Sequence, residues 1–110
     1  MLNKDETFLK HIFDEIDFLE TQFNELEFQD LMADPVLQRA CLRSLEIIGE
    51  AVKNISDDLK NENPEIEWRK IAGLRDKLIH HYFGVDWEIV WNVIKTKIPE
   101  IKKILKTIKF

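Results

Sequence analysis

The chain is poor in residues that interrupt regular structure. Its 110 residues include three glycines, three prolines and one cysteine, so we expect long elements joined by short connections, which favours helices. Cys41 cannot form a disulfide within the chain, and its place on an apolar helix face indicates a small buried hydrophobe. No apolar run approaches the roughly 18 residues of a membrane span, and residues 1–6 lack a signal-peptide pattern. These absences predict a cytoplasmic protein that does not enter membranes.

The charges are distributed unevenly along the chain, whose net charge is −5. The part before Trp68 has 17 acidic and 6 basic side chains, whereas the part from Trp68 onward has 4 acidic and 10 basic ones. This asymmetry indicates an electropositive surface on an otherwise acidic protein, suited to a polyanion. Mutual attraction of the two halves within one bundle explains it equally well.

Apolar side chains recur at helical spacing over most of the sequence. The predicted long helices span about 4–26, 35–54 and 65–82, followed by a last helix that starts after Asp86. Residues 28–33 are expected to form a short helical turn or a linker, and residues 56–63 a loop or a single turn. No strand pattern competes with them. We therefore predict one all-α domain over residues 1–110, an up-and-down bundle of four main helices with a kinked or split last helix.

Local signals fix the expected helix ends. Asp34-Pro35 and Asn63-Pro64 are typical starts, in which an N-cap acceptor precedes proline at the first helical position. Gly84 is a typical end, and Pro99 should kink or divide the last helix. Gly49 lies inside the second helix at a cost of about 1 kcal/mol relative to alanine. Such a glycine predicts the close approach of another helix.

The stretch from Trp68 to Asp86, WRKIAGLRDKLIHHYFGVD, contains the pattern Arg-x4-His-x-Tyr in Arg75, His80 and Tyr82. Together with SLEIIGEA at Ser44–Ala51 and the later Trp91 and Ile98-Pro99, it resembles the HepT-like toxins of the HEPN superfamily. Those proteins are the ribonucleases of toxin–antitoxin pairs. The resemblance covers most of the chain from about Asp34 onward.

The resemblance implies a dimer and a regulated tyrosine. HEPN ribonucleases are described as symmetric dimers with a composite site between the subunits. The matching tyrosine, Tyr82, is in that family adenylylated by a partner nucleotidyltransferase antitoxin. An anionic nucleotide on Tyr82 blocks an RNA cleft by its charge and bulk.

The residue types themselves suit RNA cleavage without a metal or another cofactor. Histidine titrates near neutral pH, so one imidazole can accept a proton while another donates one. The guanidinium of Arg75 fits the non-bridging phosphate oxygens. The 2′-hydroxyl is then the nucleophile, the substrate is RNA and a cyclic 2′,3′-phosphate is the expected product. The adjacent His80 and His81 lack the i, i+4 spacing of helical metal ligands, so we expect no metal site.

Helix geometry constrains how these groups meet. Five positions rotate by roughly 140° around a helix, so Arg75 and His80 cannot share a face of the predicted helix, whereas Arg75 and Tyr82 can. Either the helix loosens before Gly84, or two copies supply groups to a joint cleft. The resemblance implies the second arrangement, with Arg75 and His80 as the catalytic residues.

Further residues are candidates for supporting roles. Asp76 is expected to orient the arginine or the histidine, His81 to contact phosphate as an accessory, and Glu50 to assist from the second helix. Each candidate also has a purely structural interpretation: an ion pair for Arg75, a helix C-terminal contact for His80, a helix pair with a lysine for Asp76, a solvated side chain for Glu50 and a core edge for Tyr82.

Aromatic residues do not add a binding surface to this interpretation. Trp68, Trp87 and Trp91 fall on apolar stripes and are expected in the core, not as platforms for bases. Two other classes of function remain compatible with the sequence: a non-catalytic HEPN-type module that binds RNA, a nucleotide or a nucleotidyltransferase, and a plain helical scaffold.

Overall fold

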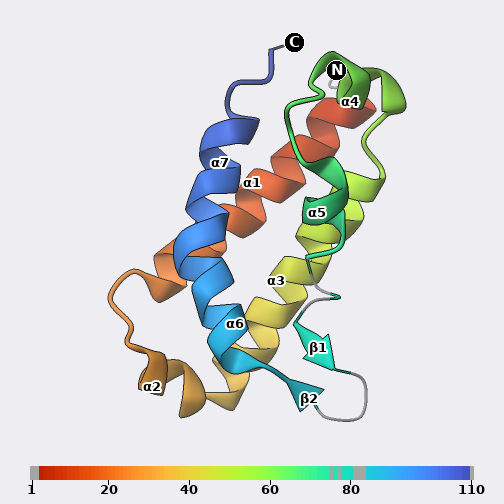
Figure 1. Ribbon diagram of the computed structural model, residues 1–110. Helices are drawn as coiled ribbons and strands as arrows, with labels where there is room; N and C mark the ends of the chain where they lie inside the picture. Colours follow the sequence, from red (N-terminus) through yellow and green to blue (C-terminus); the bar gives the residue numbers. More distant parts are fainter. Residues whose placement is uncertain (1–2, 75, 77, 81–83, 110) are drawn as a thin grey trace.

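The computed structural model describes residues 3–74, 76, 78–80 and 84–109 and confirms the all-α class (Figure 1). Its helices are α1 (Lys4–Phe23), α2 (Phe28–Met32), α3 (Pro35–Lys53), α4 (Asp57–Glu62), α5 (Trp68–Ala72), α6 (Trp87–Asn92), the π-helix η3 (Val93–Lys97) and α7 (Ile98–Leu105). Strands β1 (Ile79–His80) and β2 (Gly84–Val85) form a short antiparallel pair. Among the described residues no helix is long and apolar enough to cross a membrane.

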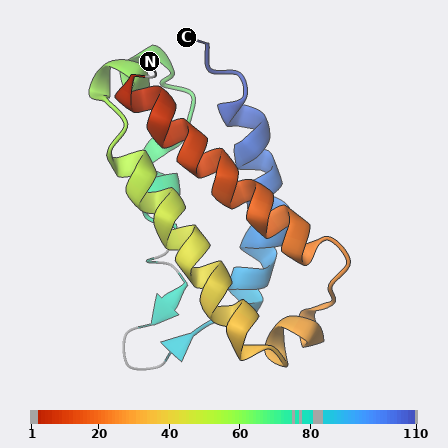
Figure 2. The same ribbon diagram turned by 180° about the vertical axis from the view of Figure 1, so that it is seen from behind.

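The long helices run up and down, as predicted. Helices α1 and α3 lie side by side in opposite directions (Figure 2), and α6, η3 and α7 follow one another as a single rod that packs across α1. Helix α5 lies against α3, and the β1–β2 pair lies at the end of the bundle where α3 and α6 begin (Figure 1). The expected apolar stripes of the first, second and last helices meet in the core, where the largest completely buried side chains include those of Phe23, Ile12, Ile16, Leu19, Leu45, Ile48, Leu78, Ile98 and Leu105.

Capping side chains start the helices at the predicted places. The side chains of Asn3, Asp34 and Asp86 accept hydrogen bonds of 2.8, 3.0 and 3.2 Å from the backbone N–H three residues on. Each bond satisfies one of the N–H groups that a helix start leaves without a partner. Helix α3 ends at Lys53, as expected, while α1 ends at Phe23, earlier than the predicted end at about residue 26.

A π-helix interrupts the last helical rod just before Pro99, the residue at which a kink or a division is expected. Proline has no N–H to donate to the carbonyl four residues earlier, and its ring collides with that carbonyl, here of Lys95. The chain widens into the π-helix η3 just before this point, where the Ile98 N–H donates to the carbonyl of Val93 instead. Within η3, the Lys95 ammonium donates to the carbonyl of Phe23 at 2.8 Å. The widened turn therefore also closes the C-terminal end of α1.

The predicted third helix over 65–82 is wrong. Asn63 does not cap a following helix: its side chain donates to the carbonyl of Leu59 at 3.0 Å and closes the end of α4. The chain then turns to bury Ile66, and the helix begins only at Trp68. It stops after five residues at Ala72, with Gly73 as its C-cap. In place of the predicted third long helix the bundle has the short helix α5, and the strands β1 and β2 follow it.

Gly49 explains how closely α5 can pack on α3. An added Cβ at Gly49 would lie 2.8 Å from the carbonyl oxygen of Ala72, which is closer than real Cβ contacts come. The neighbouring atom is backbone, so it cannot swing aside. The predicted close approach at Gly49 is confirmed, and the element that approaches is the last turn of α5.

We expect Gly49→Ala to destabilise the protein, although alanine favours a helix by about 1 kcal/mol. Overpacking against a backbone atom costs about 1–3 kcal/mol, so thermal unfolding should show a Tm lower by roughly 5 °C. Gly73→Ala is the matched control, because its Cβ would have its nearest neighbour at 3.4 Å and its φ is −90°. That variant should match or exceed the parent. A Gly49→Ala protein at least as stable as the parent contradicts the close contact.

Candidate functional site

The structure places the candidate residues of the Arg-x4-His-x-Tyr motif only in part. His80 ends strand β1, and Asp76 is exposed, with its backbone N–H donating to the carbonyl of Gly73 at 3.1 Å. Arg75, His81 and Tyr82 lie outside the described residues. Their roles, and the orienting role of Asp76, stay predictions.

The backbone around His80 is fixed from both sides. Leu78, two residues earlier, is completely buried, and its carbonyl accepts a 3.1 Å hydrogen bond from the N–H of Asp86. Strand β1 pairs with β2 so that Ile79 lies opposite Val85 and His80 opposite Gly84. Asp86 also caps α6. The position of His80 is therefore tied to the core through Leu78 and to the start of the last helical rod through Asp86.

Gly84 supplies the backbone conformation that this pairing uses. Its φ is +84°, in the left-handed region that glycine adopts without strain. Apart from its chain neighbours, no residue that the structure describes has an atom within 4 Å of the place where a Cβ would stand, so the left-handed conformation is what calls for glycine here. The prediction that Gly84 ends a helix is wrong, because Gly84 lies in strand β2 and α5 ends at Ala72.

The helix geometry expected for Arg75 and His80 does not apply. Helix α5 ends at Ala72 and His80 lies in a strand, so a rotation of 140° around one helix does not separate the two residues. The helix ends at Ala72, twelve residues before Gly84, so the expected loosening just before Gly84 does not describe this segment either. The positions of Arg75 and His80 around a helix therefore give no argument for a dimer.

Glu50 lies on a different part of the surface from the β1–β2 pair. Its carboxylate is 3.4 Å from the ammonium of Lys53, and it lines a hollow of about 190 Å³ between α1 and α3 together with Phe8 and His11. These contacts fit the solvated side chain that was its structural interpretation. An accessory role for Glu50 stays a prediction.

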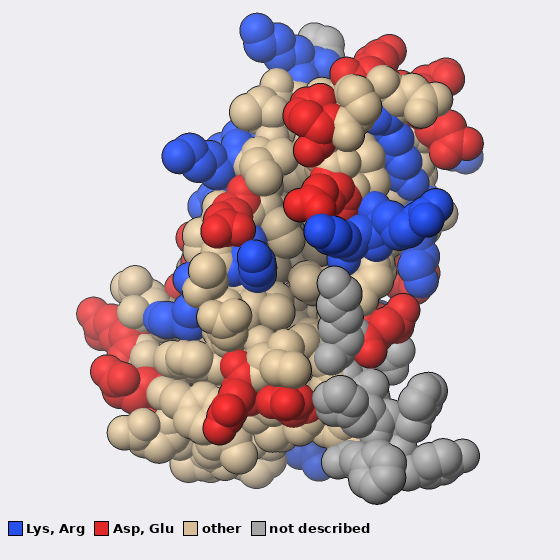
Figure 3. Space-filling view, in the orientation of Figure 1, with Lys and Arg blue, Asp and Glu red and all other residues tan. Residues whose placement is uncertain are grey.

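Sequence reasoning passed over two cations that precede the motif. Arg69 and Lys70 are both exposed on α5, and they border an open hollow of about 540 Å³. Figure 3 shows Lys and Arg side chains gathered over α5, with acidic side chains beside them. The available signal was the pair of cations directly after Trp68, at the point where the chain turns from acidic to basic.

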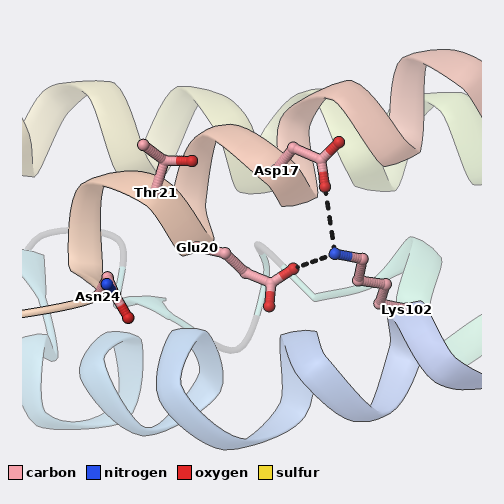
Figure 4. Close-up of a pocket in the computed structure, with 5 residues that line it drawn as sticks. All are labelled: Asp17, Glu20, Thr21, Asn24 and Lys102. Carbon is pink, nitrogen blue, oxygen red and sulfur yellow. Dashed lines mark hydrogen bonds and ion pairs between the residues drawn. The ribbon is translucent and has the colours of Figure 1, made fainter.

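Another hollow, of about 580 Å³, has the opposite electrostatic character. Figure 4 shows Lys102 of α7 between Asp17 and Glu20 of α1, with Thr21 and Asn24 completing the lining. The Lys102 ammonium is 2.8 Å from Glu20 and 3.3 Å from Asp17, and these bonds raise its pKa. The ion pairs of Lys102 join α7 to α1. Because this lysine is already bound by two carboxylates, the lining of the hollow does not favour a phosphate.

The described residues offer neither a metal cluster nor a reactive thiol. Among them, no group of three or more His, Cys, Asp or Glu side chains is placed to hold a metal ion. Cys41 is completely buried, as predicted, and burial raises its pKa to about 11. At neutral pH the thiol is therefore protonated and is not a nucleophile.

Comparison with known proteins gives the family. The family model described as "Ribonuclease HepT-like" matches residues 12–108. "Putative RNase TTE0752" of Caldanaerobacter subterraneus is 48% identical over 92% of this chain and 90% of its own. "Probable ribonuclease HepT" of Thermococcus cleftensis is 45% identical over 93% of both chains, and "Putative RNase MJ0127" of Methanocaldococcus jannaschii is 45% identical over 92% of this chain and 84% of its own.

No solved structure matches the chain significantly. The family match spans nearly the whole sequence, including α3 with Gly49, the complete motif region and the split last helix. The chain therefore belongs to the HepT-like ribonuclease family.

Proposed function

We propose that this protein is a metal-independent endoribonuclease that acts as the toxin of a cytoplasmic toxin–antitoxin pair and needs no cofactor. The observation that carries the proposal is the Arg75-x4-His80-x-Tyr82 pattern, which lies within the 97-residue stretch matched by the ribonuclease family model, residues 12–108. Relatives named as ribonucleases align over about nine-tenths of the chain. The tie of His80 to buried Leu78 and to α6 supports it, because a catalytic group must be held in position.

The proposed reaction is transfer of the phosphoryl group to the neighbouring 2′-oxygen. A base takes the proton of the 2′-hydroxyl as its oxygen forms a bond to phosphorus. The bond from phosphorus to the 5′-oxygen breaks, and an acid gives that oxygen a proton. Imidazole groups at His80 act as base and acid, and the Arg75 guanidinium stabilises the negative charge that builds on the non-bridging oxygens.

The active form is proposed to be a homodimer. The 2′-oxygen and the 5′-oxygen lie on opposite sides of phosphorus in an in-line displacement, so the base and the acid must also lie on opposite sides. One chain supplies a single His80. A second copy related by a two-fold axis supplies another His80 and another Arg75 to the same cleft.

The proposed partner is a nucleotidyltransferase-type antitoxin that adenylylates Tyr82. The hydroxyl of the tyrosine would attack the α-phosphate of ATP, and pyrophosphate would leave. The added nucleotide carries a negative charge on a residue two positions after His80, and it therefore opposes the binding of RNA.

His80→Ala should abolish cleavage. Loss of general acid–base catalysis costs about 10²–10⁴-fold in rate, and EDTA should leave the parent unaffected. The assay incubates total RNA or an unstructured oligoribonucleotide with pure protein and identifies cyclic 2′,3′-phosphate ends. His11→Ala is the matched control, because His11 lies in the first half of α1, away from the β1–β2 pair (Figure 2). Tight RNA binding by the parent without cleavage supports the binding module instead, and equal cleavage by His80→Ala removes the catalytic assignment.

Activity should follow the dimer. We expect light scattering to give twice the mass of the chain, and the rate per chain to fall on dilution below the concentration at which the dimer dissociates. An RNA-cleaving species verified as a monomer, with the full rate per chain, contradicts a composite site.

Tyr82→Phe should keep the ribonuclease activity and resist the antitoxin. Tyr82 is the only tyrosine of the chain, so incorporation of labelled AMP from ATP into tyrosine should disappear in this variant. The parent treated with the same enzyme and ATP is the control. Complete inhibition of Tyr82→Phe under the conditions that inhibit the parent argues against modification at this residue.

A further inference from the structure

An open hollow lies beside α5, directly before the motif in the sequence. It is lined by Ile66, Glu67, Trp68, Arg69, Lys70 and Gly73 and has a volume of about 540 Å³. Sites for small molecules span roughly 300–1,000 Å³, so the hollow is large enough for one planar heterocycle. It is distinct from the acid-lined hollow between α1 and α7 and from the one that Glu50 lines.

The apolar walls of this hollow are held rigidly. Ile66 and Trp68 line it and are otherwise buried, and Trp68 was expected in the core. The Trp68 indole N–H donates to the carbonyl of Asn63 at 3.1 Å, which fixes the orientation of the ring. Gly73 has no side chain, and a Cβ there would have one neighbour within 4 Å, the carbonyl oxygen of Arg69 at 3.4 Å. A flat group can therefore approach the backbone of Gly73 closely.

The rim of the hollow is cationic. Arg69 and Lys70 are exposed, and Lys70 forms an ion pair with Glu67. Arg69 has no ion pair with another residue that the structure describes. Its guanidinium is thus available to a phosphate, for which its planar fork of donors is suited.

In the sequence, the residues that line the hollow directly precede the motif. Gly73 lies two residues before Arg75, and between Trp68 and His80 the sequence has four cations, Arg69, Lys70, Arg75 and Lys77, against the single carboxylate of Asp76. The excess of positive charge in the later part of the chain therefore begins in the residues that lead into the motif. A strand of RNA held at His80 meets further positive charge when it extends toward α5.

We propose that the hollow beside α5 is a subsite for one unpaired base of the RNA that flanks the cleaved bond, with Arg69 on a neighbouring phosphate. This inference rests on the proposed ribonuclease function. Single-stranded RNA is held by just this combination, since bases lie against apolar or aromatic walls and cations follow the backbone. The subsite makes the enzyme select single-stranded over duplex RNA.

Binding of an RNA that cannot be cleaved separates the subsite from catalysis. Fluorescence anisotropy measures the affinity for a short oligonucleotide with 2′-O-methyl groups. Arg69→Gln should weaken binding by about 5- to 10-fold and lower the slope of log K against log salt by about 1. Gly73→Val, which fills the hollow, should weaken it by about 5- to 100-fold. The control is Lys10→Gln in the first half of α1, whose start lies at the opposite end of the bundle from the β1–β2 pair (Figure 2). It removes one exposed positive charge away from α5 and should leave binding unchanged.

An abasic scan identifies the base. Removing one base near the cleavage position should weaken binding to the parent by about 5- to 100-fold, but should have little effect on Gly73→Val, in which the hollow is already filled. In cleavage assays Arg69→Gln should raise KM and leave kcat nearly unchanged. Thermal unfolding of each variant checks that it is folded, and Arg69→Gln on the exposed surface provides the test if Gly73→Val is not.

The outcomes distinguish the two proposals. If the parent binds and cleaves RNA while both variants bind it as tightly as the parent, the subsite is wrong and the ribonuclease stands. If both variants keep RNA binding but lose binding of a purified antitoxin, the hollow is a protein site and the inference is overturned. If the parent neither binds nor cleaves RNA, the proposed function fails first.

Discussion

The contact between Gly49 and the carbonyl of Ala72 governs the arrangement of this protein. Because Gly49 has no side chain, the backbone of the last turn of α5 can lie directly on the backbone of α3. From that point the chain turns at Gly73, buries Leu74 and Leu78 and forms the strand pair that holds His80. A larger residue at position 49 would push the last turn of α5 away from α3 and would shift Gly73 and Leu74, which follow it directly.

The parts of the fold that could be predicted from sequence are those in which local and tertiary forces agree. Asp34 and Asp86 cap helices whose apolar stripes are long enough to be unambiguous, and Pro99 splits the last helix because proline removes a donor wherever it lies. The prediction of the third helix was wrong because the local signals at its two ends are ambiguous. Asn63 can close the preceding helix or start the next one, and either Gly73 or Gly84 can end the helix. Asn63 donates backward to close α4 when it could have accepted forward. Gly73 ends α5, whereas the sequence pattern predicts the end at the more distant Gly84.

The candidate site shows the same division. Its residue types and their order follow from the motif, which needs no structure to be recognised. Its backbone does not, because the β1–β2 pair has only two residues in each strand and has no alternating pattern of its own. The pair exists because Leu78 is buried and Asp86 starts α6, so tertiary anchors at both ends impose what the local sequence does not specify. Arg69 and Lys70 went unnoticed for a related reason, since exposed cations on a helix are ordinary until the hollow beside them is known.

The short α5 alters the argument for two subunits. With Arg75 and His80 on one straight helix, a dimer would be required to bring them to the same phosphate. With His80 in a strand, helix geometry no longer requires a dimer, and the reason for two subunits is the proposed reaction. Attack by the 2′-oxygen and departure of the 5′-oxygen occur on opposite sides of phosphorus, whereas the histidines of the motif, His80 and His81, are neighbours in one chain. In the proposed homodimer, a two-fold axis through the cleft would place the second imidazole on the far side of phosphorus.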